Sequence, residues 1–202
     1  MSDKTRETKA KERRRRILSA ARTVFEKHGG LSAGLRPIAA AAGCTTGAIY
    51  ASFSSKEEIY AALLEESLGE LSAVVAAAVA KEASPDQALR AATRAFFEYY
   101  QSHSFELRLG LYLFEPDGRT GLGSERDAAL NDALNETIEI FTACFERLAA
   151  SSRTREHSPI ERAHSLFAAL IGALTIARAR RDQSLQTDAR KVLDVLIDLH
   201  LA

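Results

Sequence analysis

The chain has 202 residues and no net charge, with 27 Lys and Arg against 27 Asp and Glu. That length suits one large domain, or a small domain fused to a larger one, and it allows a real core. The neutral average hides a split, because residues 1–56 hold 12 basic against 4 acidic side chains and residues 57–202 hold 15 against 23. Net charges of +8 and −8 predict a nucleic-acid-binding segment joined to one that does not bind nucleic acid.

The cysteine pattern and the apolar stretches exclude several protein classes. Cys44 and Cys144 are far apart and form neither a metal-ligand spacing nor a disulfide framework, which favours a reducing cytoplasm. The first residues are charged and lack the apolar segment of a secretory signal. The longest apolar stretch, residues 166–177, is too short to span a bilayer and is predicted to be a buried helix. We therefore expect a cytoplasmic chain with no membrane partner and no metal site.

Abundant Ala, Leu and Glu, few prolines and rare β-branched runs predict an all-α chain. Residues 1–10 are polar and are expected to form a disordered tail. A first helix is predicted over residues 11–28, because apolar side chains recur on one face and Gly29-Gly30 follows. That face consists of Ile17, Leu18, Ala21, Val24 and Phe25.

Two short helices are predicted next, and together they form a helix-turn-helix. The first covers about residues 35–42, where Pro37 is acceptable only in the first turn and Gly43 ends the helix. The second runs from about residue 46 to residue 52, and Thr45 is placed to cap it.

Longer helical segments are expected beyond residue 55. Ser84-Pro85, a glycine-rich loop over residues 115–124 and a polar loop over residues 151–157 separate several of them. The predicted helices cover about residues 56–82, 85–102, 105–114, 125–150, 158–181 and 187–201.

The helix predicted over residues 46–52 has the size and surface of a helix that reads DNA. A major groove admits one α-helix, and side chains near the N-terminus of that helix read base edges. Ile49 and Phe53 lie four residues apart and should pack inward. The Tyr50 hydroxyl suits a phosphate oxygen, and Lys56 starts the next helix, where free N–H groups also attract phosphate. The exposed residues are small and let the backbone approach DNA: Thr46, Gly47, Ala48 and Ser52.

This stretch closely resembles the DNA-binding domain of the TetR family of bacterial transcriptional regulators. The resemblance covers about residues 12–66 and joins many residue types at fixed offsets over three helices. The matching motifs are Arg16-Ile17-Leu18-x-Ala20-Ala21, Phe25-x-x-x-Gly29, Ile38-Ala39, Ala42-Gly43, Thr45-x-Gly47-x-Ile49-Tyr50-x-x-Phe53, and Ser55-Lys56-Glu57 with Ile59.

The resemblance implies DNA contacts position by position. Arg36 falls where some members have an arginine that reaches DNA. The family often has His or Tyr where this chain has Ser52, so one groove or phosphate contact is expected to be weaker or absent. The positions that fall where the family contacts DNA are Thr45, Thr46, Gly47, Ala48, Tyr50, Ser52 and Lys56.

The basic run Arg13–Arg16 has two interpretations. Arg13 and Arg14 are expected to contact phosphate or to reach an adjacent minor groove. The alternative is a solvated helix face or a tail, because only part of a four-residue run faces one direction on a helix.

The resemblance also implies the domain organisation. A disordered tail over residues 1–10 precedes a helix-turn-helix DNA-binding domain over residues 11–56. Residues 57–202 are then an effector-binding and dimerisation domain of about six helices, which dimerises through its last two long helices.

Aromatic side chains concentrate in this second domain, where they build either plain core or an effector cavity. Binding pockets are mostly apolar with few polar anchors, so several of these side chains are candidate lining residues. The candidate pocket residues are Phe96, Tyr100, His103, Arg108, Tyr112, Phe141, Phe145 and Phe167.

Apolar stripes on the last two long helices suit self-association. Two such helices from each chain would form a four-helix bundle across a two-fold axis. A dimer would present two recognition helices about 34–36 Å apart, which matches successive major grooves. The candidate interface residues are Leu166, Leu170, Leu174, Val192, Leu196 and Leu199.

The motifs favour a regulator over an enzyme, because the sequence contains no Gly-rich phosphate loop, nucleophile elbow or metal cluster. We expect no cofactor. The leading hypothesis is a repressor that binds a palindromic double-stranded operator as a homodimer and is released by a small, largely apolar effector. One alternative is a DNA-binding regulator without a small-molecule effector, controlled by a partner protein or by abundance. Another is a helical module whose basic terminus binds something other than DNA.

Overall fold

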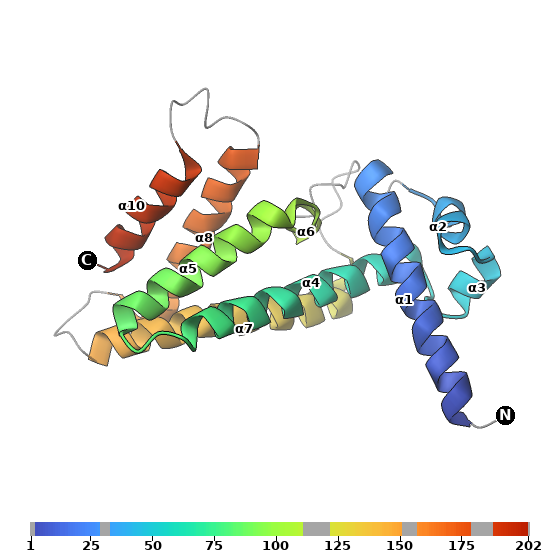
Figure 1. The fold of residues 1–202 in the computed structure, drawn as a ribbon, viewed down its shortest axis with the longest axis horizontal. Coiled ribbons are helices and arrows are strands. Elements are labelled where there is room, and N and C mark those ends of the chain that lie inside the picture. The colour runs from blue at the N-terminus through green and yellow to red at the C-terminus, as the bar shows by residue number, and fades with distance from the viewer. Residues whose placement is uncertain (1–2, 29–32, 111–121, 151–156, 179–187, 202) are drawn as a thin grey trace. The chain divides into compact units, whose positions relative to one another are not determined.

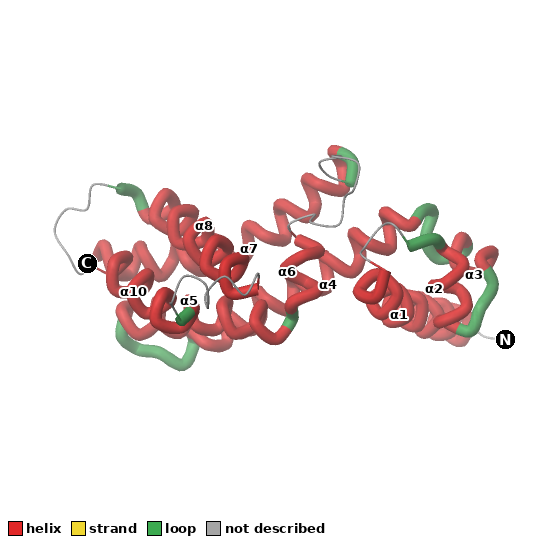
Figure 2. Tube along the Cα trace, turned by 90° about the horizontal axis from the view of Figure 1, so that it is seen from above, coloured by secondary structure: helices red, strands yellow, loops and turns green. Residues whose placement is uncertain are grey.

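The computed structural model describes residues 3–28, 33–110, 122–150, 157–178 and 188–201. Every regular element in these ranges is an α-helix, as the all-α prediction requires (Figures 1 and 2). The helices are α1 (Asp3–His28), α2 (Leu35–Ala42), α3 (Thr46–Tyr50), α4 (Lys56–Val79), α5 (Pro85–Ser102), α6 (Ser104–Gly110), α7 (Ser124–Ala150), α8 (Pro159–Arg178) and α10 (Ala189–Leu201).

The start and stop signals in the sequence predicted most helix ends to within a few residues of the ends that the structure shows. The bounds of α2 and α5 agree with the prediction, and α3 ends two residues earlier than expected. The helix predicted to reach residue 82 ends at Val79, and turns follow it. Parts of the predicted elements lie outside the described residues, namely 111–114, 115–121, 151–156, 179–181 and 187.

The disordered tail predicted for residues 1–10 is wrong for residues 3–10, because α1 begins at Asp3. This first part of α1 is exposed from residue 5 onward and has no apolar face that would mark it as a helix. An ion pair between Lys11 and Glu7, one turn apart, joins the Nζ and Oε1 atoms at 2.8 Å and supports the helix.

The chain divides into two compact units, and the division differs from the predicted boundary at residue 56. The first unit comprises Met1–Ser67 and Phe105–Leu130, and the second comprises Leu68–Ser104 and Asn131–Ala202. The first turns of α4 belong to the first unit because Ile59, Tyr60 and Leu63 are buried there. In the first unit α1 packs on α2, which packs on α3.

The second unit buries the inner faces of the second half of α4 and of α5, α7, α8 and α10. The helix α5 packs against both α8 and α10, and α8 packs along α10 (Figure 1). Two ion pairs join the outer surfaces of α5 and α10, Arg90 to Asp198 at 2.8 Å and Arg94 to Asp194 at 3.2 Å. Fully buried side chains on the inner faces include Leu89, Phe96, Phe141, Phe145, Leu166, Leu170 and Ile197.

The helix α8 is predicted from the sequence to be buried, but the structure buries only one face of it. Among the described residues it is long and apolar enough to cross a membrane, a criterion that core helices of soluble proteins also meet. Less than a third of its apolar stretch is buried within the chain, and Ile160 and Ile176 are exposed. The helix therefore presents an uncovered apolar face.

Candidate DNA-binding interface

The turn between α2 and α3 depends on Gly43. This residue ends α2 in the left-handed region, with φ of 63°, where a residue without Cβ is favoured. The Gly43 N–H donates to the Ala40 carbonyl and the Cys44 N–H donates to the Ala39 carbonyl at 3.0 Å. These bonds satisfy the last carbonyls of α2 and turn the chain sharply into α3.

Thr45 caps α3 as predicted. Its backbone is extended, and its hydroxyl oxygen accepts a 3.2 Å hydrogen bond from the Ala48 N–H. Ile49 and Phe53 are buried, which confirms the inward face predicted for this short helix. The cap and the two buried anchors hold a helix of only five residues in a defined orientation.

The outward surface of α3 is small and polar, apart from one aromatic ring. Thr45 and Gly47 are exposed, Thr46 and Ala48 are half-buried, and Tyr50 is 59% exposed. A Cβ built on Gly47 would meet only the Thr45 hydroxyl oxygen, at an ordinary 3.8 Å, so the fold itself leaves room for a side chain here. A glycine at this position keeps the helix surface low enough for close approach of a DNA backbone.

Two further predicted DNA contacts lie outside α3. Arg36 is exposed in the first turn of α2, and Lys56 is half-buried as the first residue of α4.

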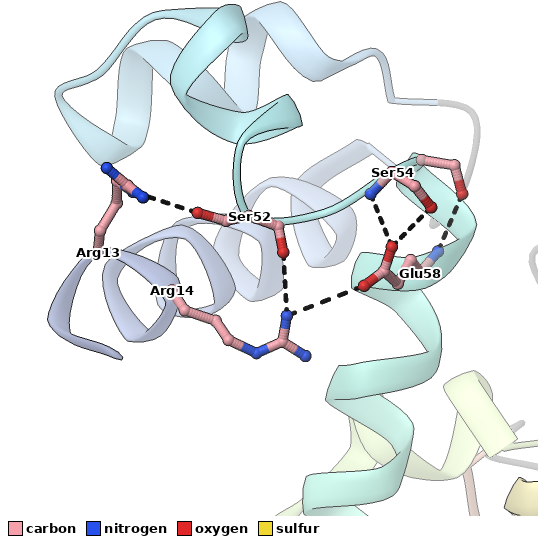
Figure 3. Close-up of polar contacts among 6 residues, drawn as sticks. Arg13, Arg14, Ser52, Ser54 and Glu58 are labelled. Carbon is pink, nitrogen blue, oxygen red and sulfur yellow. Dashed lines mark hydrogen bonds and ion pairs between the residues drawn. The ribbon is translucent and has the colours of Figure 1, made fainter. Parts of the chain in front are cut away.

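Arg13 and Arg14, which are predicted to contact DNA, both contact other residues of this chain. Both are half-buried, and both contact the segment that leaves α3 (Figure 3). The Arg13 Nε donates to the Ser52 hydroxyl oxygen at 3.2 Å, and Arg14 Nη1 donates to the Ser52 carbonyl oxygen at 3.2 Å. Arg15 and Arg16, the other half of the run, are exposed.

Glu58 lies in the first turn of α4 and closes the N-terminus of this helix. Its Oε2 atom accepts hydrogen bonds from the N–H and the hydroxyl of Ser54, at 2.6 and 2.7 Å, and the Ser55 hydroxyl accepts from the Glu58 N–H (Figure 3). Chiefly these Ser54 donors, with a smaller effect of Arg14 and Arg126, hold the pKa of Glu58 below its ordinary value. The spacing of Ser55 and Glu58 is that of a capping box.

The candidate effector residues divide between the two units. In the second unit Phe96 contacts Tyr100, Phe141 and Phe167, with ring centroids 5.1, 5.9 and 5.9 Å apart. Arg108 instead lies on α6 in the first unit, and Tyr112 lies outside the described residues.

The remaining two candidates contact neighbours outside that aromatic cluster. His103 stacks on the ring of Tyr99, with centroids 4.2 Å apart. The Phe145 ring lies 4.4 Å from the guanidinium carbon of Arg162. The role of these side chains and of Arg108 in an effector pocket stays a prediction.

Thr137 was missed in the sequence and is the buried polar group of greatest interest in the second unit. It is fully buried on α7, one helical turn before Phe141. Among the described residues its hydroxyl oxygen has no hydrogen-bond partner, which is unusual for a buried threonine.

The predicted dimer residues fall into two groups. Leu166, Leu170 and Leu174 are at most 1% exposed and belong to the core of this chain, so their side chains are not on its surface. Val192 and Leu196 are half-buried, while Leu199 is 68% exposed. Apolar residues repeat all around α8, and the sequence alone did not reveal which face packs internally.

A polar pocket lies where α8 begins and α10 ends. It has a volume of about 420 Å³ and is lined by His157, Glu161, Arg162, Ser165, Leu199 and His200. Within the described part of the chain, no three His, Cys, Asp or Glu residues are grouped so that they could hold a metal ion.

The capped α3, its small outward surface and the tight turn from α2 form a helix-turn-helix. Residues 17–63 match the model of the bacterial regulatory proteins of the tetR family. The similarity to this family therefore lies in the second half of α1, in α2 and α3, and in the first turns of α4.

One similar protein is a transcriptional activator. Over 106 residues the chain is 39% identical to the HTH-type transcriptional activator FasR of Mycolicibacterium smegmatis, a match that spans 52% of this chain and 47% of that activator. The chain therefore matches about half the length of this relative.

The fold of nearly the whole chain is shared with solved structures. The fatty acid degradation regulator FadR of Bacillus halodurans has a TM-score of 0.74 at 19% identity, covering 94% of this chain and 95% of FadR. The FadR of Bacillus subtilis, solved in complex with stearoyl-CoA, has a TM-score of 0.74 at 18% identity, covering 93% and 97%. At these identities the likeness concerns the fold.

Proposed function

We propose that this chain is an effector-responsive repressor that binds a palindromic operator as a homodimer in the cytoplasm. The observation that carries the proposal is the TetR-type domain with α3 capped, anchored and exposed on its outward side. The proposed DNA contacts are Arg36, Thr45, Thr46, Gly47, Ala48, Tyr50 and Lys56.

Selection of bound duplexes from a random pool tests DNA binding, symmetry and spacing together. We expect a palindrome whose half-site centres lie about one helical turn, or a multiple of it, apart. Tyr50→Phe should weaken binding to the selected duplex without changing the fold, because the exposed hydroxyl is lost. A pool that yields no enriched sequence would contradict the DNA-binding proposal.

The uncovered apolar face of α8 and α10 supports the homodimer. Its exposed side chains are Ile160, Ile176, Val195 and Leu199, which are 40–68% exposed in the single chain. Exposed apolar residues gathered on two packed helices are characteristic of a protein interface. The half-buried Val192 and Leu196 from the sequence prediction remain part of this proposed interface.

The molar mass in solution tests the dimer. The wild-type chain should have twice the mass of 22.0 kDa at micromolar concentration, and Leu199→Glu should shift it toward the monomer. Val74→Glu is a matched control, because Val74 is an exposed apolar residue on α4, 43% exposed, outside the proposed interface. Equal dissociation by both variants would exclude this face as the specific contact.

An acyl chain is the effector class that the comparisons and the second unit favour. A TetR-like fold neighbour was solved with stearoyl-CoA, and another is a fatty acid degradation regulator. The cluster of Phe96, Tyr100, Phe141 and Phe167 offers an apolar wall, and the Thr137 hydroxyl one turn from Phe141 offers an unused polar group. Pockets of this composition suit apolar ligands with one polar end.

Thermal unfolding with stearoyl-CoA, stearic acid and coenzyme A tests this effector class. A ligand that binds the folded chain raises the unfolding temperature by mass action, so stearoyl-CoA or stearic acid should raise it and coenzyme A alone should not. The active acyl compound should also lower the affinity for the selected duplex, because it binds a conformation unsuited to DNA. No shift with any acyl compound would favour a regulator controlled by a partner protein or by abundance.

Activation is a second candidate, favoured by the 39% identity to the activator FasR over 106 residues. A promoter carrying the selected duplex in front of a reporter gene separates the two modes. Repression predicts higher reporter output when the gene for this chain is deleted, and activation predicts lower output.

A further inference from the structure

Helical geometry divides the run Arg13–Arg16 into two pairs with different surroundings. Residues four apart lie on the same helix face, so Arg13 shares a face with the buried Ile17 and Arg14 with the buried Leu18. Accordingly Arg13 and Arg14 are half-buried, whereas Arg15 and Arg16 are exposed. The two pairs therefore cannot be assigned the same role from charge alone.

Arg14 contacts three groups that come from two segments beyond α3, and Figure 3 shows two of these contacts, those with Ser52 and Glu58. Its Nη1 atom donates to the Ser52 carbonyl oxygen at 3.2 Å and lies 4.0 Å from Glu58 Oε1. Its guanidinium carbon lies 4.2 Å from the centroid of the buried Phe53 ring. A planar guanidinium that stacks on a ring while donating at its edge uses properties that lysine lacks.

The segment that Arg14 holds sets the direction of the recognition helix. Only residues 51–55 separate the end of α3 at Tyr50 from the start of α4 at Lys56. The N–H groups of Ser52 and Phe53 donate to the Ile49 carbonyl at 2.8 and 2.9 Å, so these residues continue directly from α3. Fixing Ser52 and Phe53 against α1 therefore also restricts the orientation of α3.

Arg13 strengthens this attachment from the neighbouring position. Its Nε atom donates to the Ser52 hydroxyl oxygen at 3.2 Å, so the side chain and the carbonyl of one residue are both bound by α1. On the other side of the segment, Ser54 is fixed by Glu58. The exit of α3 is thus held between α1 and the first turn of α4.

We propose that Arg14, supported by Arg13, is a positioning residue that orients the recognition helix through Ser52 and Phe53, and not a direct phosphate contact. The proposal rests on the proposed DNA-binding function. A phosphate contact strengthens binding to every duplex alike, whereas correct placement of α3 matters most for the duplex whose bases are read. The two roles therefore predict different losses of affinity for the selected duplex and for a random-sequence duplex.

The test compares Arg14→Lys and Arg14→Gln with Arg15→Gln as the matched control, an exposed arginine of the same run. Binding is measured by fluorescence anisotropy on the duplex that the wild-type chain selects from a random pool and on a random-sequence duplex, each over a salt series. Hydrogen exchange of the amides of residues 52–58 is measured on each free protein, and thermal unfolding checks that each is folded.

A positioning role predicts that both Arg14 variants lower the ratio of selected to random affinity by about tenfold, because charge-assisted bonds and ring stacking are lost. The salt dependence should stay as in the wild type, and the amides of residues 52–58 should exchange faster. Arg15→Gln should leave the affinity ratio and these amides unchanged. If Arg14→Gln does not fold, Arg14→Lys decides the question.

A direct phosphate contact predicts the opposite pattern and would overturn the proposal. Arg14→Lys would then bind like the wild type, and Arg14→Gln would weaken both duplexes equally while reducing the salt slope by about 0.9. Unchanged binding and exchange in both variants would overturn it as well. If the wild type prefers no sequence, the proposed function fails separately, and exchange in residues 52–58 alone then decides whether Arg14 holds the exit of α3.

Discussion

The Tyr60 hydroxyl donates a 2.8 Å hydrogen bond to the carbonyl oxygen of Leu109, which lies 49 positions further along the chain. Both residues are buried, and the bond joins α4 to α6 within the first unit. The Tyr60 ring also packs against Phe25 of α1, with centroids 6.0 Å apart. A single side chain thus ties the core of the helix-turn-helix domain to a distant short helix.

Replacing Tyr60 by Phe keeps the ring and removes the donor. The Leu109 carbonyl is then left without this partner, so we expect the free energy of unfolding to fall by about 1–2 kcal/mol. Urea denaturation followed by circular dichroism measures this loss. Tyr50→Phe is the control, because Tyr50 is 59% exposed and its stability should not change. Equal stability of both variants would show that the Tyr60 bond contributes nothing.

A second attachment of α6 is the ion pair between Arg22 Nη1 and Glu106 Oε1, 3.4 Å apart. The Glu106 side chain is only 7% exposed, while that of Arg22 is 35% exposed. Arg22→Ala should therefore cost about 2–3 kcal/mol, since it leaves a buried carboxylate unpaired. In the double variant with Glu106→Gln the loss should be smaller than the sum of the single losses. Additive losses in urea denaturation would contradict a direct interaction.

Glu58 should make the free energy of unfolding depend on pH in the acid range. Its pKa in the folded chain is lowered, first by the Ser54 hydroxyl and then by the Ser54 N–H, so the fold favours the ionised carboxylate. Its contribution to the free energy of unfolding is therefore complete above the ordinary carboxyl pKa and is lost as pH falls through the lowered value.

Urea denaturation between pH 7 and pH 3 tests this dependence. The stability difference between the wild type and Glu58→Gln should shrink as pH falls below about 4.5, the region of an ordinary glutamate pKa. Ser54→Ala removes one of the two donors and should reduce the pH-dependent part without abolishing it. A difference that stays constant with pH would contradict the capping role of Glu58.

The two cysteines should differ in reactivity. Cys144 is buried, and burial raises the pKa of its thiol despite an opposing effect of Arg147, so little thiolate forms near neutral pH. Cys44 is half-buried in the turn before α3. A thiol reagent at pH 8 should modify one cysteine in the folded chain and two in urea, and Cys44→Ser should abolish the reaction of the folded chain. Rapid labelling of Cys144 in that variant would be inconsistent with its burial.

Local signals in the sequence predicted the helices well where apolar periodicity or a breaker was present. Gly43 correctly predicted the end of α2, and Ser84-Pro85 correctly predicted the start of α5. The start of α1 was missed because a fully polar helix has no apolar face, and its support comes from pairs such as Glu7 with Lys11. The unit boundary within α4 was also missed, because it depends on α6, a distant segment.

Local sequence signals also predicted part of the candidate DNA-binding interface. The buried positions of Ile49 and Phe53 followed from their spacing, and Thr45 from its capping chemistry. The direction of a long charged side chain is not fixed by its type. The sequence therefore predicts a DNA contact for Arg14, whereas in the structure Arg14 donates to the Ser52 carbonyl of its own chain. The direction of such a side chain depends on tertiary contacts, which a local sequence pattern does not contain.

Thr137 provides a test of the second unit that does not depend on a ligand. Its hydroxyl is fully buried and has no hydrogen-bond partner among the described residues, so desolvation of this group is not compensated. Thr137→Val keeps the shape and removes the hydroxyl, and the free energy of unfolding should rise by about 1 kcal/mol.

Thr93→Val is the matched control, because Thr93 is equally buried but its hydroxyl donates to the Leu89 carbonyl at 2.7 Å. That variant loses a bond and should be less stable than the wild type, as measured by urea denaturation. If Thr137→Val were destabilised to the same extent as Thr93→Val, the Thr137 hydroxyl would have to be bonded in solution, and it could not serve as an unused polar group for an effector.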